Sequence, residues 1–128
     1  DAVVMSSKSF KIIQKFPRGL TYAVYTRDLA AFVNHRSDII TAFPTNDSPA
    51  DLLAKLQQQG KKRIVIAGGS SIYSLFLQSR LVTKMYLTVE PILFGQGVNL
   101  CREALNVKLK LDQVKQLSSQ TLLLVYSL

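Results

Sequence analysis

Four small residues, Gly68, Gly69, Ser70 and Ser71, interrupt the most hydrophobic segment of the chain, IVIAGGSSIYSLFL. They follow an aliphatic run typical of a buried strand and precede a segment that we predict to be helical. The N-terminus of a helix presents unpaired N–H groups and a partial positive charge, and glycine lets an anion approach the backbone closely. The pattern therefore indicates either a phosphate-binding turn or a tight turn with a purely structural role. It contains neither a Walker loop nor a complete GxGxxG motif.

Two other segments have polar residues at the end of a predicted strand. The stretch MSSKS, residues 5–9, places small hydroxyl residues where a helix begins, and YTRD, residues 25–28, carries Thr26 and Arg27. Ligands of open α/β sheets bind beyond the carboxyl ends of the strands. Three such ends, two of them opening helices and one carrying an arginine, would suit a ligand with several phosphates. The alternative is that the serines only cap helices and that Arg27 is a surface charge.

The elements that would position these residues alternate between strands and helices. Ser48 and Pro49 mark the start of one helix and Gly60 its end, which makes this helix the clearest in the chain. Pro91, inside a predicted strand, indicates a bulge or a sheet edge. The predicted elements are strands over 2–5, 21–26, 38–43, 63–67 and 84–94, a helix within 6–16 that Pro17 ends, helices over 48–59 and 70–79, and two terminal strands joined by a turn at 118–120.

This order of elements predicts an α/β domain. Crossover connections followed by a hairpin give a mostly parallel sheet with an antiparallel edge. The length of 128 residues suits one domain over 1–128, and 48% apolar residues suffice for a buried core. We find no internal repeat and no apolar run near the ~20 residues that a membrane span needs, so we predict no membrane partner.

The net charge of +8 narrows the classes of partner. The basic residues are scattered along the chain and form no nucleic-acid-binding signature, so we predict no nucleic-acid partner. A solvated basic surface and a site for a phosphorylated ligand both remain open. The single cysteine, Cys101, excludes an internal disulfide, and the N-terminal segment lacks the order of a secretion signal, so we expect a cytoplasmic protein.

Few other residues carry a signal for chemistry. Cys101 has no metal-ligand neighbours in the sequence and is expected to be a buried or half-buried hydrophobic residue, and we predict no metal site. His35, the only histidine, has no partner suggested by the pattern and is expected at the surface. Glu90 lies within an apolar strand and could be a site carboxylate, although an edge position fits it better.

Four motifs taken together resemble those of the dihydrofolate reductase family. They are DAVVMSSKSF, YAVYTRD, IVIAGGSSIYSLFL and MYLTVEPILFGQG, in this order and spacing, and the resemblance covers essentially the whole chain. The reductase domain of riboflavin biosynthesis shares this fold. The resemblance implies a three-layer αβα dihydrofolate reductase-like sheet, NADPH as cofactor, and hydride transfer to a pterin or a related heterocycle.

The resemblance also implies roles for individual residues. In the family the glycine pair carries a cis peptide and opens the helix that holds the pyrophosphate, and Thr26 and Arg27 match the part that holds the 2′-phosphate. Thr88 matches a threonine that helps to hold the pterin ring, with Ala67 and Tyr73 near the nicotinamide and the pterin. The cofactor-binding residues implied in this way are Ser6, Ser7, Lys8, Ser9, Thr26, Arg27, Ala67, Gly68, Gly69, Ser70, Ser71, Ile72 and Tyr73.

Three departures from the family pattern limit these expectations. Ser6 and Ser7 replace a Gly-Arg pair, so a cation for the cofactor phosphates is missing, and Leu20 stands where the arginine for the folate carboxylate belongs. The chain also begins after the family's first strand and helix, which include the central strand of the sheet and the acid that helps to protonate the pterin. We therefore assign no catalytic residue. We predict that an N-terminal segment, a partner chain or a rearranged dimer fills the gap, since unpaired strand edges are costly.

Three functions remain open. The first is NADPH-dependent reduction of dihydrofolate or a related pterin, which would place the chain in one-carbon metabolism and tetrahydrofolate biosynthesis. The second is reduction of an aminouracil precursor of riboflavin, which the loss of the folate arginine favours. The third is a non-catalytic family member that binds a nucleotide or serves as a subunit. Ser6, Ser7, Leu20 and the absent acid favour this third function.

Overall fold

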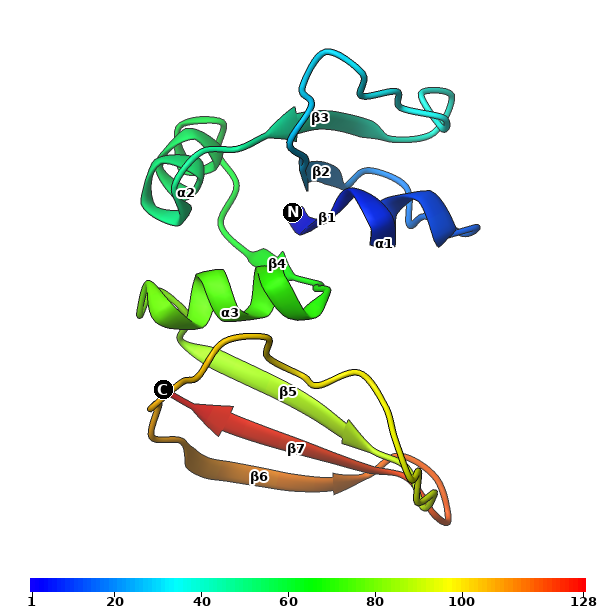
Figure 1. Ribbon diagram of the computed structural model, residues 1–128, viewed down its shortest axis with the longest axis vertical. Coiled ribbons are helices and arrows are strands. Elements are labelled where there is room, and N and C mark those ends of the chain that lie inside the picture. The colour runs from blue at the N-terminus through cyan, green and yellow to red at the C-terminus, as the bar shows by residue number, and fades with distance from the viewer.

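The computed structural model of the chain describes residues 1–128 and has the predicted order of strands and helices (Figure 1). The helices predicted over 48–59 and 70–79 are confirmed to within one residue at each end. The terminal hairpin is also confirmed. The elements are β1 (Ala2–Ser6), α1 (Ser7–Ile12), β2 (Thr21–Tyr25), β3 (Thr41–Thr45), α2 (Pro49–Gln58), β4 (Ile64–Ile66), α3 (Ser70–Gln78), β5 (Lys84–Val89), β6 (Lys110–Gln116) and β7 (Leu122–Ser127).

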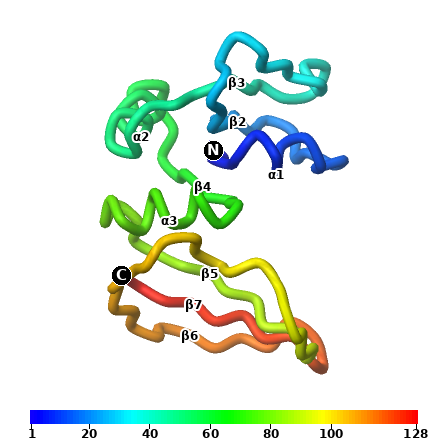
Figure 2. The backbone as a smooth tube through the Cα atoms, in the orientation of Figure 1, coloured from blue at the N-terminus to red at the C-terminus, as the bar shows by residue number.

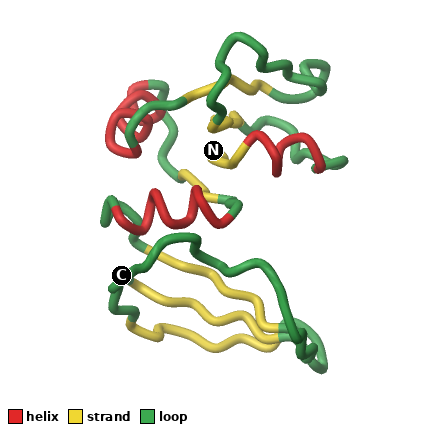
Figure 3. The backbone as a smooth tube through the Cα atoms, in the orientation of Figure 1, coloured by secondary structure: helices red, strands yellow, loops and turns green.

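The strands form two separate sheets, not one. A parallel sheet has the order β3-β2-β1-β4, and an antiparallel sheet has the order β5-β7-β6. Figure 3 shows the two groups of strands at opposite ends of the molecule, with α3 between them. The predicted α/β class with both strand directions is confirmed, but the antiparallel strands are not joined to the edge of the parallel sheet. The reason is that no strand lies between β4 and β5.

The gap between β4 and β5 is an apolar groove of about 740 Å³. Ile64, Val65 and Ile66 line it from β4, and residues 84–87 line it from β5. Each of these strands is paired on one side only, β4 with β1 and β5 with β7. The groove therefore lies at the position where the resemblance to the dihydrofolate reductase family implies a further central strand. That a further segment or a second chain fills it stays a prediction.

The hydrophobic core lies on the two faces of the parallel sheet. On one face, Leu52 and Leu56 from α2 and Phe76 from α3 pack against β1 and β2. On the other face, Phe10 from α1 packs with Met5 and other residues of β1 and β2. This part of the chain therefore has the expected three layers, helix, sheet and helix.

Some element boundaries differ from the prediction for local reasons. The first helix ends at Ile12, well before Pro17, because Ile13 is already extended with φ −71° and ψ 126°. β5 ends at Val89, not at residue 94, since Pro91 has no N–H to continue the ladder. A long connection over 90–109 follows instead and runs back along the antiparallel sheet (Figure 2).

The short third strand is also shifted from its predicted position. It covers Thr41–Thr45, and not residues 38–43. The preceding residues form a turn in which the N–H groups of Ile39 and Ile40 both donate to the carbonyl of Arg36 at 3.0 Å. The aliphatic pair in this segment therefore closes a turn and does not begin the strand.

Candidate functional site

The carboxyl ends of three parallel strands lie at one edge of the sheet. β1 and β2 are in register from Ala2 to Ser6, and Val4 of β1 is paired with Ile66 of β4. The Ser6 N–H donates to the Gly68 carbonyl at 2.8 Å, beyond the last ladder pair. The structure thus brings the MSSKS segment and the glycine turn together, as the sequence predicted.

The glycine turn packs directly against an aromatic ring. Gly68 has φ +88°, and the peptide bond between Gly68 and Gly69 is cis, as the resemblance implied. A Cβ at Gly68 would lie 2.8 Å from Cε2 of Tyr73, so no side chain fits there without a shift of the ring. A Cβ at Gly69 would lie 3.8 Å from the Ser9 hydroxyl oxygen. Gly68 therefore has to be a glycine for the turn to pack against the Tyr73 ring, whereas a Cβ at Gly69 would meet Ser9 at an ordinary contact distance.

The N-terminus of α3 presents hydrogen-bond donors that have no acceptor within the protein. Gly69 is the N-cap and supplies no side-chain cap, while its carbonyl accepts from the N–H groups of Ile72 and Tyr73. The N–H groups of Gly69, Ser70 and Ser71 and both serine hydroxyls make no hydrogen bond. Because these donors point out of the helix end with its partial positive charge, an anionic group fits there.

Two serines at the start of α1 are hydrogen-bonded to each other, unlike the serines at the start of α3. The Ser6 hydroxyl caps the helix, accepting from the Ser9 N–H at 3.2 Å and lying 3.0 Å from the Ser9 hydroxyl. Ser6 therefore caps the helix, and a contact of Ser6 and Ser9 with the cofactor stays a prediction. Ser7 and Lys8 make no side-chain hydrogen bond or ion pair, and the Lys8 ammonium is exposed.

The end of β2 carries a cation, Arg27, that has no partner within the protein. Thr26 is fixed by its N–H, which donates to the Thr45 carbonyl at 3.1 Å, and by its hydroxyl, which contacts the Asp28 backbone. Arg27 is exposed and forms no ion pair with a carboxylate. Ser7 and Thr26 line one cavity of about 560 Å³, so the ends of β1 and β2 face a common space.

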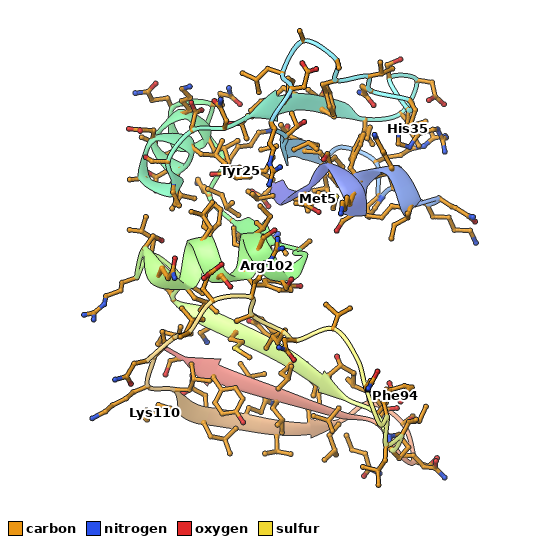
Figure 4. The ribbon with its side chains drawn as sticks, in the orientation of Figure 1. Met5, Tyr25, His35, Phe94, Arg102 and Lys110 are labelled. Atoms are coloured by element: carbon orange, nitrogen blue, oxygen red, sulfur yellow. The ribbon has the colours of Figure 1, made fainter.

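Sequence reasoning missed the aromatic wall of this cavity. Phe10, Phe32 and His35 line it, and the His35 ring is exposed as predicted but lies 4.9 Å from the Phe10 ring, edge-on. Figure 4 shows His35 on the loop above α1. Phe10 lies in the first predicted helix, but nothing in the sequence placed His35 against it.

Not all predicted site residues come together. Ile72 is only 6% exposed, its side chain belongs to the core, and its N–H is bonded to Gly69, so only its position in the helix relates it to the site. Thr88 is exposed on β5, where it pairs with Leu123, and makes no contact with the glycine turn. Tyr73 lies between the glycine turn and the groove next to β5, because its ring touches Gly68 and also lines the groove. Ala67 is exposed beside the turn.

A half-buried phenol ties β2 to the loop before α2. The Tyr25 hydroxyl donates to the Asp47 carbonyl at 2.9 Å. Burial, with a smaller contribution from the Asp47 charge, raises the pKa of Tyr25 to about 12. The Tyr25 hydroxyl donates its proton to a backbone carbonyl, so we assign this residue a structural role.

The remaining candidates have simple surroundings. Glu90 is exposed and accepts a hydrogen bond from the Thr121 hydroxyl at 2.9 Å, which confirms the edge position. Cys101 is half-buried as expected. None of the three helices is long and apolar enough to cross a membrane.

The helices on both faces of the parallel sheet, the antiparallel hairpin and the glycine turn before α3 define a dihydrofolate reductase-like protein. Residues 21–123 match the family described as the RibD C-terminal domain. The chain therefore belongs to the RibD C-terminal domain family, in the riboflavin-reductase branch of this fold.

Solved structures confirm the fold at low sequence identity. A protein from Shewanella sp. PV-4 assigned to riboflavin biosynthesis superimposes with a TM-score of 0.79 and 21% identity, covering 99% of this chain and 73% of its own. A second structure, from Thermotoga maritima, superimposes with a TM-score of 0.77 and 15% identity, covering 98% of this chain and 44% of its own. It is a diaminohydroxyphosphoribosylaminopyrimidine deaminase/5-amino-6-(5-phosphoribosylamino)uracil reductase.

A curated relative is similar over part of its length. The uncharacterized protein YwjB of Bacillus subtilis is 32% identical over 72 residues, which are 56% of this chain and 41% of that protein. The matched region thus spans well under two thirds of both YwjB and the Thermotoga enzyme.

Proposed function

We propose that the chain is an NADPH-binding reductase domain that acts on an aminouracil precursor of riboflavin. The observation that carries this proposal is the unpaired N–H groups of Gly69, Ser70 and Ser71 at the N-terminus of α3, in a member of the RibD C-terminal domain family. The glycine pair before these donors leaves the backbone open to a close approach by an anion, which supports a phosphate-bearing cofactor over a purely structural turn.

The residues at the sheet edge fit the dinucleotide. The N-terminus of α3 would hold the pyrophosphate, and the exposed Arg27 beside Thr26 would hold the 2′-phosphate. Lys8 supplies a second free cation nearby in the MSSKS segment, in place of the arginine that the family pattern has one position earlier. NADPH would supply the hydride, and the protein would bind and orient it.

The substrate class follows from the family match and from one residue. The comparisons favour the second of the three functions over dihydrofolate reduction, since the family and the named structural relatives belong to riboflavin biosynthesis. Leu20, half-buried on the loop before β2, offers no charge for a folate carboxylate. We infer a uracil carrying an amino group and a phosphorylated ribose-derived chain. A cytoplasmic location remains an expectation.

Cofactor binding is tested by titrating the chain with NADPH and NADH and following the nicotinamide fluorescence. Arg27→Met should weaken NADPH binding by about tenfold to a hundredfold, because it removes a charge-assisted contact, and leave NADH binding nearly unchanged. Arg18→Met, which removes another exposed arginine, is the control and should bind as wild type does. Equal loss of NADPH and NADH binding in Arg27→Met would contradict the assigned 2′-phosphate contact.

Substrate choice is tested by NADPH oxidation. 5-Amino-6-(5-phosphoribosylamino)uracil should accelerate it and dihydrofolate should not. The reverse result would restore the pterin function. Binding of NADPH without turnover of either compound would favour the non-catalytic alternative.

A further inference from the structure

The long connection between β5 and β6 is held against α3 by a buried serine. Ser74 is only 1% exposed, and its hydroxyl oxygen accepts from the Arg102 N–H at 2.7 Å and from the Glu103 N–H at 3.1 Å. Just before this contact, Leu100 lines the groove together with Tyr73 of α3. Figure 2 shows this part of the connection passing beside the helix. The backbone at Arg102 therefore has a fixed place next to the middle of α3.

The side chain of Arg102 has no partner within the protein. It is exposed, forms no ion pair with a carboxylate, and donates no side-chain hydrogen bond, although Glu103 is its neighbour in the sequence. An exposed arginine is by itself an ordinary surface charge. Arg102 differs from such a charge because two hydrogen bonds to a buried hydroxyl fix its backbone on the helix that opens the candidate site.

The distance along α3 suits a contact with the N-terminus of the helix. Ser70 and Ser74 are four residues apart and so lie on the same side of the helix. The rise between them is about 6 Å, at about 1.5 Å per residue. An extended arginine side chain has a comparable length. The guanidinium group of Arg102 can therefore reach the space in front of Ser70, whose N–H is one of the unpaired donors.

The N-terminus of α3 has little positive charge of its own. A helix N-terminus acts as about half an elementary charge, whereas each phosphate of a pyrophosphate carries a full negative charge. The first turn of α3 contains no basic residue, and the N-cap Gly69 has no side chain. Lys8 lies on α1 and Arg27 follows β2, so neither belongs to this helix. A cation on the α3 side of the site would balance the remaining charge.

We propose that Arg102 binds the pyrophosphate of the nicotinamide cofactor, and that Ser74 is the positioning residue for this contact. The inference rests on the proposed function, because it needs the cofactor at the N-terminus of α3. The planar guanidinium donates to two phosphate oxygens at once, beside the backbone donors of the helix. The pyrophosphate is common to NADPH and NADH. The 2′-phosphate, which is assigned to Arg27, belongs to NADPH alone.

The test is titration with NADPH and with NADH, followed by nicotinamide fluorescence. Arg102→Met should weaken both cofactors equally, by about tenfold to a hundredfold, because a charge-assisted contact to a shared group is lost. The variant keeps its backbone N–H and hence the tether to Ser74, so it should melt as wild type does. Arg80→Met is the matched control. It removes an exposed arginine just beyond the opposite end of α3 and should bind both cofactors as wild type does.

A double-mutant cycle tests the positioning role of Ser74. Ser74→Ala keeps the charge of Arg102 but releases its backbone, and should weaken both cofactors by about threefold to tenfold. In the Arg102→Met background, Ser74→Ala should weaken them no further, because no guanidinium is left to position. Arg102→Lys should bind with intermediate affinity, since an ammonium keeps the charge and loses the bidentate geometry. A Ser74→Ala effect that persists in full without Arg102 would overturn the positioning role.

Failure of this inference differs from failure of the proposed function. If wild type binds neither NADPH nor NADH, the proposed function fails and the inference fails with it. If wild type binds and Arg102→Met binds equally well, only the inference is overturned. Loss of NADPH binding without loss of NADH binding would move Arg102 to the 2′-phosphate. A raised KM for the aminouracil at unchanged cofactor affinity would move it to the phosphate of the substrate. Either result also overturns the inference.

Discussion

The parallel sheet and the antiparallel sheet of this chain differ in how completely they are covered. Val4 of β1 and Val24 of β2 are 0% exposed, because helices and loops pack on both faces of the parallel sheet. Every residue of β6 is exposed, and Val125 is the one buried residue of the antiparallel sheet. Most of the buried apolar area, and hence most of the hydrophobic stabilisation, therefore belongs to the first half.

This difference places the candidate site on the well-packed half. The glycine turn is held by the Ser6–Gly68 hydrogen bond to β1 and by the contact between Gly68 and Tyr73. The antiparallel sheet carries Thr88, on the far side of the groove. Cofactor binding should therefore depend on the first half and on Arg102, which Ser74 ties to it, while turnover requires the two halves to be held in a fixed relation.

The largest predicted effect comes from truncating the core of the first half. Leu52→Ala should lower the free energy of unfolding by about 2–5 kcal/mol, because Leu52 is 0% exposed and its truncation leaves a cavity in the core. Leu111→Ala, on the antiparallel sheet, should cost less than about 1 kcal/mol. Urea unfolding followed by circular dichroism measures both, at low protein concentration. Similar losses in the two variants would show that the halves are equally important for stability.

The glycine turn should give the next largest effect. Gly68→Ala places a methyl group 2.8 Å from the Tyr73 ring at a φ of +88°, which should cost about 1–3 kcal/mol and abolish NADPH binding. Gly95→Ala is the control, since a Cβ there meets nothing within 4 Å, and it should change neither quantity. A Gly68→Ala variant that binds NADPH with wild-type affinity would remove the turn from the site.

A single serine joins the two halves and should give a smaller effect. The Ser74 hydroxyl in α3, 1% exposed, accepts from the N–H groups of Arg102 at 2.7 Å and Glu103 at 3.1 Å. Figure 4 shows Arg102 beside α3. Ser74→Ala should therefore cost about 1–2 kcal/mol, since two hydrogen bonds are lost.

The measurement for Ser74→Ala is amide hydrogen exchange as well as unfolding. Exchange should accelerate over 98–106 and along the antiparallel sheet, and remain slow in β1 and β2. Ser71→Ala, on the same helix but exposed and unbonded, should leave exchange unchanged. Uniform acceleration in Ser74→Ala would mean that the chain opens as one unit.

The sequence predicted the first half better than the second. Ser48, Pro49 and Gly60 mark the ends of α2 because capping is local, and the Ser48 hydroxyl does accept from the Asp51 N–H. The glycine turn was predicted from the same kind of local signal. The early end of α1 and the turn before β3 were missed. The turn is closed by hydrogen bonds of Ile39 and Ile40 to the Arg36 carbonyl, which no pattern in the sequence indicated.

The antiparallel half was harder to predict because its strands depend on contacts distant in sequence. The two terminal segments on either side of the turn at 118–120 predicted the hairpin, yet they could not show that most of the antiparallel sheet would stay exposed. The wall of the cavity that includes His35 and the link from Ser74 to Arg102 are likewise products of tertiary packing. No periodicity encodes such contacts between distant segments.

The smallest effect should come from an ion pair at the surface of the first half. The Lys55 ammonium donates to the Asp47 carboxylate at 2.7 Å, and this hydrogen bond is the main reason that the pKa of Asp47 lies below its usual value of 3.8. A carboxyl whose pKa is lower in the folded state stabilises the fold above the unfolded pKa. That contribution is lost as the pH falls through the folded value, in the window below about pH 4.

Two variants isolate this contribution. Asp47→Asn should show slightly lower stability than wild type at pH 7, and the difference should vanish as the pH falls below 4. Lys55→Met keeps the carboxylate and removes its partner, so it should lose the same part of the pH dependence. Circular dichroism melts at a series of pH values measure both curves. If Lys55→Met kept the wild-type pH profile while Asp47→Asn did not, the low pKa of Asp47 would have to come from its second partner, the Thr45 hydroxyl.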